Sequence, residues 1–263
     1  MSEPLTKCER DGAVAIVTLA RPDALNALSL AMEAELKGRF ASLCADPEVR
    51  CIILTGEGRA FSAGVDLKEL GGGPAALRGR IWHGEDSLAD AMRRCAKPII
   101  AAVNGYAITG GLELALQADF IVAAYTAKFA DTHARVGITP SWGMTQILPR
   151  LIGVNRARQM SLTGEFIDAA KAEAWGLVNE VTTPEALMDR AKATAADIAE
   201  TDEVAASKIH RLIDETAEMT LKEGGARERQ VFDAHIATVT PEMIEANRQR
   251  VQARGKRVAG GNR

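Results

Sequence analysis

Short apolar runs alternate with helical patterns in the first half of this 263-residue chain, and this alternation limits the folds open to it. The runs lie at residues 13–19, 51–54, 98–103 and 120–124, and the first three end at turns rich in glycine, proline or asparagine. Runs this short, apolar on both faces, predict buried strands. Strands that alternate with helices predict an α/β core with helices packed on the sheet.

The helical patterns divide the chain into two parts. Ser29 precedes apolar residues at helical spacing and is expected to cap a helix that ends at Asp46-Pro47. Gly110-Gly111 is expected to open a short helix that runs to Gln117. From residue 184 onward we find helical patterns alone, at 184–200, 204–218, 222–236 and 241–254. A flexible loop is expected at 71–74 and a frayed tail at 260–263.

Composition excludes several classes of protein. A net charge of -3 argues against a general basic surface for nucleic acid, and 4% aromatic residues argue against stacking platforms for bases. No stretch reaches the roughly 18 apolar residues of a membrane span, and no signal-peptide pattern opens the chain, so we expect no membrane partner. The cysteines show no CxxC spacing and predict reduced thiols and a cytoplasmic location: Cys8, Cys44, Cys51 and Cys95.

Motifs of four common enzyme classes are missing. Gly56 and Gly58 follow a strand as in a dinucleotide-binding loop, but Phe61 occupies the place of the third glycine. GxxxxGK[ST] and GxSxG do not occur, so Ser62 and Ser141 have no sequence support as nucleophiles. The histidines lack metal-ligand spacing, and no metal is expected: His83, His133, His210 and His235.

Two glycine-rich junctions between strands and helices remain. Ala63-Gly64-Val65-Asp66 is one, and Thr109-Gly110-Gly111 is the other. Two backbone N–H groups aimed at one point form an oxyanion hole, which helps any reaction that places negative charge on a carbonyl oxygen. Glu113 lies in the first turn of the helix that follows Gly110. It is a candidate general base, and the alternative is that it only complements the helix dipole.

Four blocks of the sequence, at 21–27, 60–69, 97–115 and 137–146, resemble the successive signature blocks of the crotonase superfamily, the enoyl-CoA hydratase/isomerase proteins. The resemblance implies an α/β fold in which a spiral of repeated ββα units precedes a C-terminal helical oligomerisation region. Residues 1–200 would form the acyl-CoA-binding catalytic core. Residues 201–263 would serve trimer assembly and close the site, in a homotrimer or a hexamer made as a dimer of trimers.

The resemblance also assigns roles to residues. It places the two oxyanion donors at the N–H groups of Val65 and Gly110, and the first catalytic glutamate at Glu113. Coenzyme A enters as part of the substrate, so no separate cofactor is implied, and either Arg21 or Lys68 would meet its phosphates. The residues implied in CoA binding are Arg21, Ala24, Ala63, Asp66, Leu67 and Lys68.

The sequence departs from the family pattern at one position. The resemblance expects a second catalytic glutamate at position 133, where this chain has His133. We hypothesise that His133 supplies or relays a proton, which its near-neutral intrinsic pKa would suit, and the alternative is a histidine that only supports the pocket wall. Asp131 is a less favoured acid. Trp142 is expected either to shape the acyl pocket or to pack in the core.

The expected function is therefore that of an enoyl-CoA hydratase-like lyase, which adds water across the 2,3 double bond of an enoyl-CoA thioester. One alternative is a double-bond isomerase or another crotonase-type reaction on acyl-CoA. An alternative of a different class is an oligomer that binds acyl-CoA without catalysis.

Overall fold

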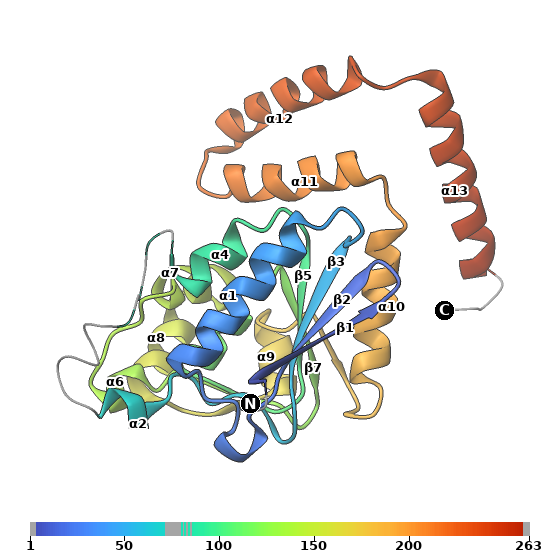
Figure 1. The fold of residues 1–263 in the computed structure, drawn as a ribbon. Coiled ribbons are helices and arrows are strands. Elements are labelled where there is room, and N and C mark those ends of the chain that lie inside the picture. The colour runs from blue at the N-terminus through green and yellow to red at the C-terminus, as the bar shows by residue number, and fades with distance from the viewer. Residues whose placement is uncertain (1–3, 72–79, 81, 83, 85, 260–263) are drawn as a thin grey trace. The chain divides into compact units, whose positions relative to one another are not determined.

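The computed structural model describes residues 4–71, 80, 82, 84 and 86–259. The expectations for residues 72–74 and 260–263 lie outside the described residues. Figure 1 shows the order of the elements along the chain. The strands are β1 (Thr6–Asp11), β2 (Val14–Leu19), β3 (Cys51–Gly56), β4 (Ala60–Ser62), β5 (Ile99–Val103), β6 (Tyr106–Ile108), β7 (Phe120–Ala124), β8 (Lys128–Ala130), β9 (Ile167–Asp168) and β10 (Glu180–Thr182).

The described helices begin with the 3₁₀ helix η1 (Pro22–Ala24) and the long helix α1 (Leu30–Ala45). Ser29 caps α1 by accepting a hydrogen bond from the N–H of Met32, as the sequence predicted. The others are α2 (Leu67–Leu70), α4 (Leu88–Arg93), α5 (Gly110–Ala115), α6 (His133–Val136), α7 (Met144–Ile152), α8 (Val154–Thr163), α9 (Ala169–Trp175), α10 (Leu187–Ala199), α11 (Glu203–Thr216), α12 (Leu221–Ile236) and α13 (Pro241–Ala259).

The described strands form two sheets. The larger has the order β1-β2-β3-β5-β7-β10, in which β1 pairs antiparallel with β2 and the remaining neighbours are parallel. Its alternate residues enter two different cores. On one face Ile52 and Leu54 pack in the cluster that contains the apolar side of α1, and on the other Cys51 and Ile53 pack with α10. Both faces are buried along the central strands β2, β3, β5 and β7, which explains why their sequences are apolar runs.

The smaller sheet has the order β4-β6-β8-β9, and β4, β6 and β8 are parallel. Each of these short strands follows a strand of the larger sheet and precedes a helix, giving the units β3-β4-α2, β5-β6-α5 and β7-β8-α6. This repeat confirms the ββα spiral. Because parallel strands end at one edge of a sheet, the helices α2, α5 and α6 all begin at that edge.

A disulfide joins Cys44 at the end of α1 to Cys95 just after α4, with 5.4 Å between their Cα atoms. The prediction of reduced thiols is therefore wrong for this pair. Cys8 and Cys51 are free. The sequence could not reveal the pair, because 51 residues separate the two cysteines and the packing of α1 against α4 brings them together. The cytoplasmic location stays a prediction.

The chain divides into two compact units, residues 1–199 and 200–263. The first contains both sheets, and the second contains α11, α12 and α13. The N-terminus of α12 has a capping box, in which Thr220 and Glu223 exchange hydrogen bonds between side chain and backbone. The roles expected for this unit, trimer assembly and closing the site, stay predictions.

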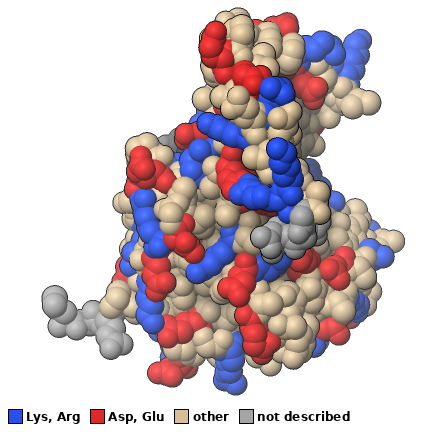
Figure 2. Space-filling model, turned by 90° about the vertical axis from the view of Figure 1, so that its right-hand side faces the viewer, with Lys and Arg blue, Asp and Glu red and all other residues tan. Residues whose placement is uncertain are grey.

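Charges of both signs are mixed on the molecular face in Figure 2, where neither sign gathers into a patch. None of the helices in the described part is long and apolar enough to cross a bilayer.

We predict that removing the disulfide with Cys44→Ser and Cys95→Ser lowers the free energy of unfolding by about 2–4 kcal/mol, since the cross-link restricts the unfolded chain. Urea denaturation measures the change, and Cys8→Ser, which removes an exposed free thiol, is the control. Alkylation of the unfolded, unreduced protein should label Cys8 and Cys51 alone. Labelling of all four cysteines would contradict the disulfide.

Candidate active site

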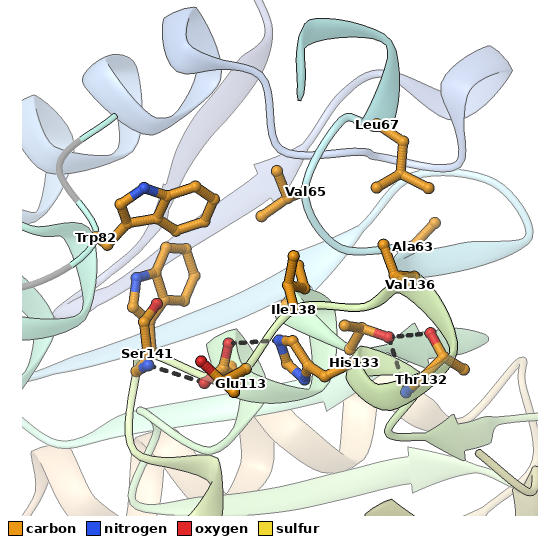
Figure 3. Close-up of a pocket in the computed structure, with 14 residues that line it drawn as sticks. Ala63, Val65, Leu67, Trp82, Glu113, Thr132, His133, Val136, Ile138 and Ser141 are labelled. Carbon is orange, nitrogen blue, oxygen red and sulfur yellow. Dashed lines mark hydrogen bonds and ion pairs between the residues drawn. The ribbon is translucent and has the colours of Figure 1, made fainter. Parts of the chain in front are cut away.

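A pocket opens where the three helices that follow the smaller sheet begin. Its lining includes Ala63 and Val65 from the segment before α2, and Leu67 at the start of α2. Gly110 and Glu113 of α5 also line it. The remaining lining comes from the residue before α5, from α6 with the residue before it and the loop after it, and from one residue before α4: Thr109, Thr132, His133, Val136, Ile138, Thr139, Ser141, Trp142 and Trp82. The spiral thus brings the two glycine-rich junctions and position 133 to one place, as Figure 3 shows.

The two junctions touch one another through their backbones. Gly64 has φ +91°, and a Cβ atom there would lie 2.8 Å from the carbonyl oxygen of Ile108. A Cβ atom on Gly110 would lie 3.2 Å from the nitrogen of Val65, so the two N–H groups are neighbours. Within the described residues, neither of these N–H groups donates a hydrogen bond to the protein. The pair can therefore receive the oxygen of a bound carbonyl group.

A strained threonine holds the second junction. Thr109 has φ +53° although it is β-branched, a combination that costs free energy and needs support from its surroundings. Its N–H donates to the carbonyl oxygen of Ala130 at 2.8 Å, and its hydroxyl pairs with the hydroxyl of Thr132. The N–H of Thr132 also donates to the Thr109 hydroxyl at 3.1 Å. These contacts fix the peptide that carries the Gly110 N–H.

Glu113 lies buried on α5, with an exposed fraction of 3%. Its Oε1 accepts a hydrogen bond from the backbone N–H of Trp142 at 2.8 Å. Gln117 and Arg93 both donate to the carbonyl oxygen of Trp142, so the backbone of this residue is hydrogen-bonded on both sides of its Cα atom. A glutamate that only complemented a helix dipole would need none of these contacts.

His133 begins α6 and faces Glu113, with 3.4 Å between Nε2 and Oε2 (Figure 3). Its Nδ1 lies 2.7 Å from Oδ1 of Asp131. Burial lowers the pKa of His133, but the hydrogen bonds to Asp131 and Glu113 outweigh burial and raise the pKa to about 9. The imidazole is therefore protonated at neutral pH, and both ring nitrogens donate.

The pKa of Asp131 moves the opposite way. Burial raises it, but the hydrogen bonds from the His133 side chain, from Ser161 and from the His133 backbone, with the charge of His133, together outweigh burial, and the net pKa lies below its ordinary value. Asp131 is thus an anion at neutral pH and cannot be the acid of the site. It is instead the partner of His133, a relation that the sequence did not reveal.

The residues expected to bind CoA do not all lie in one place. Ala63, Val65 and Leu67 line the pocket, whereas Arg21 and Ala24 line a separate hollow beside η1. An ion pair of 3.1 Å between Arg21 and Asp66 connects the two regions, and Asp66 also caps α2. Lys68 is exposed on α2.

Trp142 lines the pocket as expected, but its backbone N–H, which holds Glu113, was not foreseen. Trp82 lies at one side of the pocket in Figure 3 and was missed, because the sequence around it has neither a helical nor a strand pattern. The guanidinium of Arg80 lies 5.5 Å from its ring, and Arg80 forms a buried ion pair with Glu33 of α1. Across the described residues, no three His, Cys, Asp or Glu side chains form a group that could hold a metal ion.

The fold and the site together define a protein in which two backbone N–H groups can polarise a carbonyl group beside the ionisable pair Glu113 and His133. A family model described as enoyl-CoA hydratase/isomerase matches residues 9–248. The chain belongs to this family, which confirms the resemblance to the crotonase superfamily.

Relatives match over almost the whole chain. A probable peroxisomal enoyl-CoA hydratase from Arabidopsis thaliana is 36% identical and covers 98% of this chain and 96% of its own. A probable enoyl-CoA hydratase from Mycobacterium bovis is 40% identical, covering 88% of this chain and 89% of its own. The crystal structure of an enoyl-CoA hydratase from Mycobacterium smegmatis matches with a TM-score of 0.86 at 32% identity, covering 95% of this chain and 97% of its own.

We predict that the free energy of unfolding falls as the pH rises from about 6.5 to about 9. Folding raises the pKa of His133 from its ordinary value of 6.5 to about 9. The contribution of the protonated imidazole to stability is therefore complete below pH 6.5, and it is lost as the pH rises through the pKa of the folded protein. Denaturation at a series of pH values measures the slope. In His133→Gln this part of the slope should vanish, whereas His235→Gln should retain it. An equal slope in His133→Gln would show that the imidazole is not the source.

Proposed function

We propose that this chain is an enoyl-CoA hydratase, a lyase that adds water across the 2,3 double bond of an enoyl-CoA thioester. The observation that carries the proposal is the pocket in which the N–H groups of Val65 and Gly110 lie beside the buried Glu113. Relatives that share 36–40% of the sequence and carry the name of this enzyme support it.

The substrate carbonyl oxygen would accept hydrogen bonds from Val65 and Gly110. When the oxygen of water attacks C3, the electron pair of the double bond moves toward C2 and the carbonyl, and the negative charge of the enolate collects on that oxygen. Donors already in place stabilise this charge without reorganisation. This accounts for why the two N–H groups have no partner in the described protein.

Glu113 would accept the proton of the attacking water, and His133 would give the proton from Nε2 to C2. The product has then gained the elements of one water molecule, OH at C3 and H at C2. At this stage Glu113 is protonated and His133 is neutral. The 3.4 Å contact between Oε2 and Nε2 offers a direct path for the proton to return to the imidazole. The pair thereby regains its starting state after each turnover.

The CoA end would meet the protein at α2 and η1. Arg21 is engaged with Asp66 and with the carbonyl oxygen of Ala27, whereas Lys68 is exposed. We therefore assign the phosphate contact to Lys68, with Arg21 and Asp66 shaping the channel beside Ala24. Ala63 and Leu67 would flank the thioester arm, and Trp142 would form the wall of the acyl pocket.

The second unit would assemble the protein into a homotrimer or a hexamer. No described residue of this unit is buried, and large apolar side chains are exposed on α11, α12 and α13, including Ile213, Phe232 and Val251. Apolar surface of this kind is typical of an interface between subunits.

We predict that Glu113→Gln lowers kcat for hydration of 2-enoyl-CoA thioesters by about 10²-fold or more, since the general base is lost while the side chain keeps its shape. The loss of the conjugated enoyl absorbance, followed over a panel of chain lengths, measures the rate.

Glu185→Gln changes an exposed glutamate and should leave the rate unchanged. If the wild type binds acyl-CoA but forms no product at high enzyme concentration, the chain is a binding protein and the proposal fails. Equal rates in Glu113→Gln and the wild type would exclude Glu113 as the base.

We also predict that Gly110→Ala lowers kcat by about 10²–10³-fold, because the added Cβ would enter the space next to the Val65 nitrogen. The same assay measures the effect. Gly38→Ala is the matched control, since a Cβ there meets nothing within 4 Å. A Gly110→Ala protein that folds and retains the wild-type rate would show that the carbonyl oxygen binds elsewhere.

A further inference from the structure

The histidine at position 133 raises a problem of charge. A carboxylic acid at this position would be neutral when protonated, whereas a protonated histidine is a cation. An imidazolium beside the single carboxylate Glu113 would give a pair without net charge. In a buried pocket such an imidazole loses its proton readily, because burial disfavours the charged form. A second negative group beside the histidine would make it hold its proton more firmly.

Asp131 is placed to do this. It is buried, with an exposed fraction of 1%, and its Oδ1 accepts hydrogen bonds from both the backbone N–H and the ring Nδ1–H of His133, at 3.2 and 2.7 Å. One oxygen atom thus holds the main chain and the ring of the same residue. With Nδ1 held, the opposite nitrogen Nε2 is directed at Glu113, as Figure 3 shows.

We propose that Asp131 is a positioning residue of the active site, which orients the imidazole of His133 and supplies the negative charge that keeps it protonated beside Glu113. The inference rests on the proposed function, and it extends that function to a residue that does not touch the substrate. With Asp131 included, the three groups share a net charge of -1, the same as a pair of carboxylates that carries one proton.

The surroundings of His133 agree with this role. The ionisable groups that act on its pKa are Asp131, in the connection before α6, and Glu113 on α5. Helix α8 also packs against α6, and the residue it presents to Asp131 is the uncharged Ser161. Among the hydrogen bonds that raise the pKa of His133, the one to Asp131 contributes more than the one to Glu113.

The test is the variant Asp131→Asn, which removes the charge but keeps an oxygen that can accept the Nδ1–H bond. We would follow the imidazole of His133 by NMR titration, with its signal assigned by its loss in His133→Gln. In the wild type the pKa should lie near 9. In Asp131→Asn it should fall by one unit or more. An unchanged value would overturn the proposal.

Asp168→Asn is the matched control, because Asp168 is an exposed aspartate that caps α9. It should leave the titration of His133 unchanged. Asp131→Glu keeps the charge on a longer side chain, so it should retain the high pKa while kcat falls. Should neither variant at 131 fold, a wild-type pKa at or below 7 would reject the proposal, and a value near 9 would support it.

Kinetics add a second readout. In the wild type kcat/KM should decline at high pH as His133 loses its proton, and in Asp131→Asn the decline should begin at a lower pH, by the same shift that the titration shows. A merely structural Asp131 would lower the rate equally at every pH. If the wild type turns over no enoyl-CoA, the proposed function fails, while the titration still decides the role of Asp131.

Discussion

The parallel pairing of β4, β6 and β8 is the constraint on which the site depends. These strands have three residues each, yet their pairing decides where the chain leaves the sheet and where α2, α5 and α6 begin. Residues as distant in sequence as Val65, Gly110 and His133 thereby reach one pocket. The central strands of the larger sheet, which are buried on both faces, supply the rigid support. The pairing of the backbone thus fixes where the functional residues lie, whatever their side chains are.

The finer geometry rests on backbone groups held by unusual contacts. Thr109 adopts a conformation that a β-branched residue disfavours, and Thr132 from the next repeat supports it. The backbone of Trp142 is hydrogen-bonded on both sides of its Cα atom: its N–H donates to Glu113, and its carbonyl oxygen accepts from Gln117 and Arg93. The third repeat and the loop after it therefore support the functional groups of the second repeat. Such support is what keeps donors in place while charge develops on a substrate.

Much of this could be predicted from the sequence, for identifiable reasons. The central strands β2, β3, β5 and β7 of the larger sheet are apolar runs, and the cap at Ser29 is a local signal, so both could be predicted directly. The smaller sheet could not, because strands of three residues are too short for a period. The strand β1 was missed as well, since all but its first residue are exposed and its sequence is mostly polar.

The site was predictable in its residues but not in its contacts. The glycine-rich junctions identified the segments 63–66 and 109–111, and the resemblance identified Val65 and Gly110 within them, together with Glu113 and position 133. The contact of His133 with Asp131 depends on the helix that begins at His133. The disulfide between Cys44 and Cys95 depends on the packing of two helices. Contacts of this kind arise from tertiary structure and leave no pattern in a single sequence.

The absence of buried residues among the described part of the second unit has a thermodynamic consequence. A helical segment that buries its side chains only in part gains limited hydrophobic free energy by folding, and a capping box such as that of Thr220 and Glu223 offsets only part of the lost chain entropy. Its order must then come from whatever covers its apolar side chains. If another copy of the chain covers them, dilution alone is enough to unfold α11, α12 and α13 in part. The stability of these helices then depends on protein concentration.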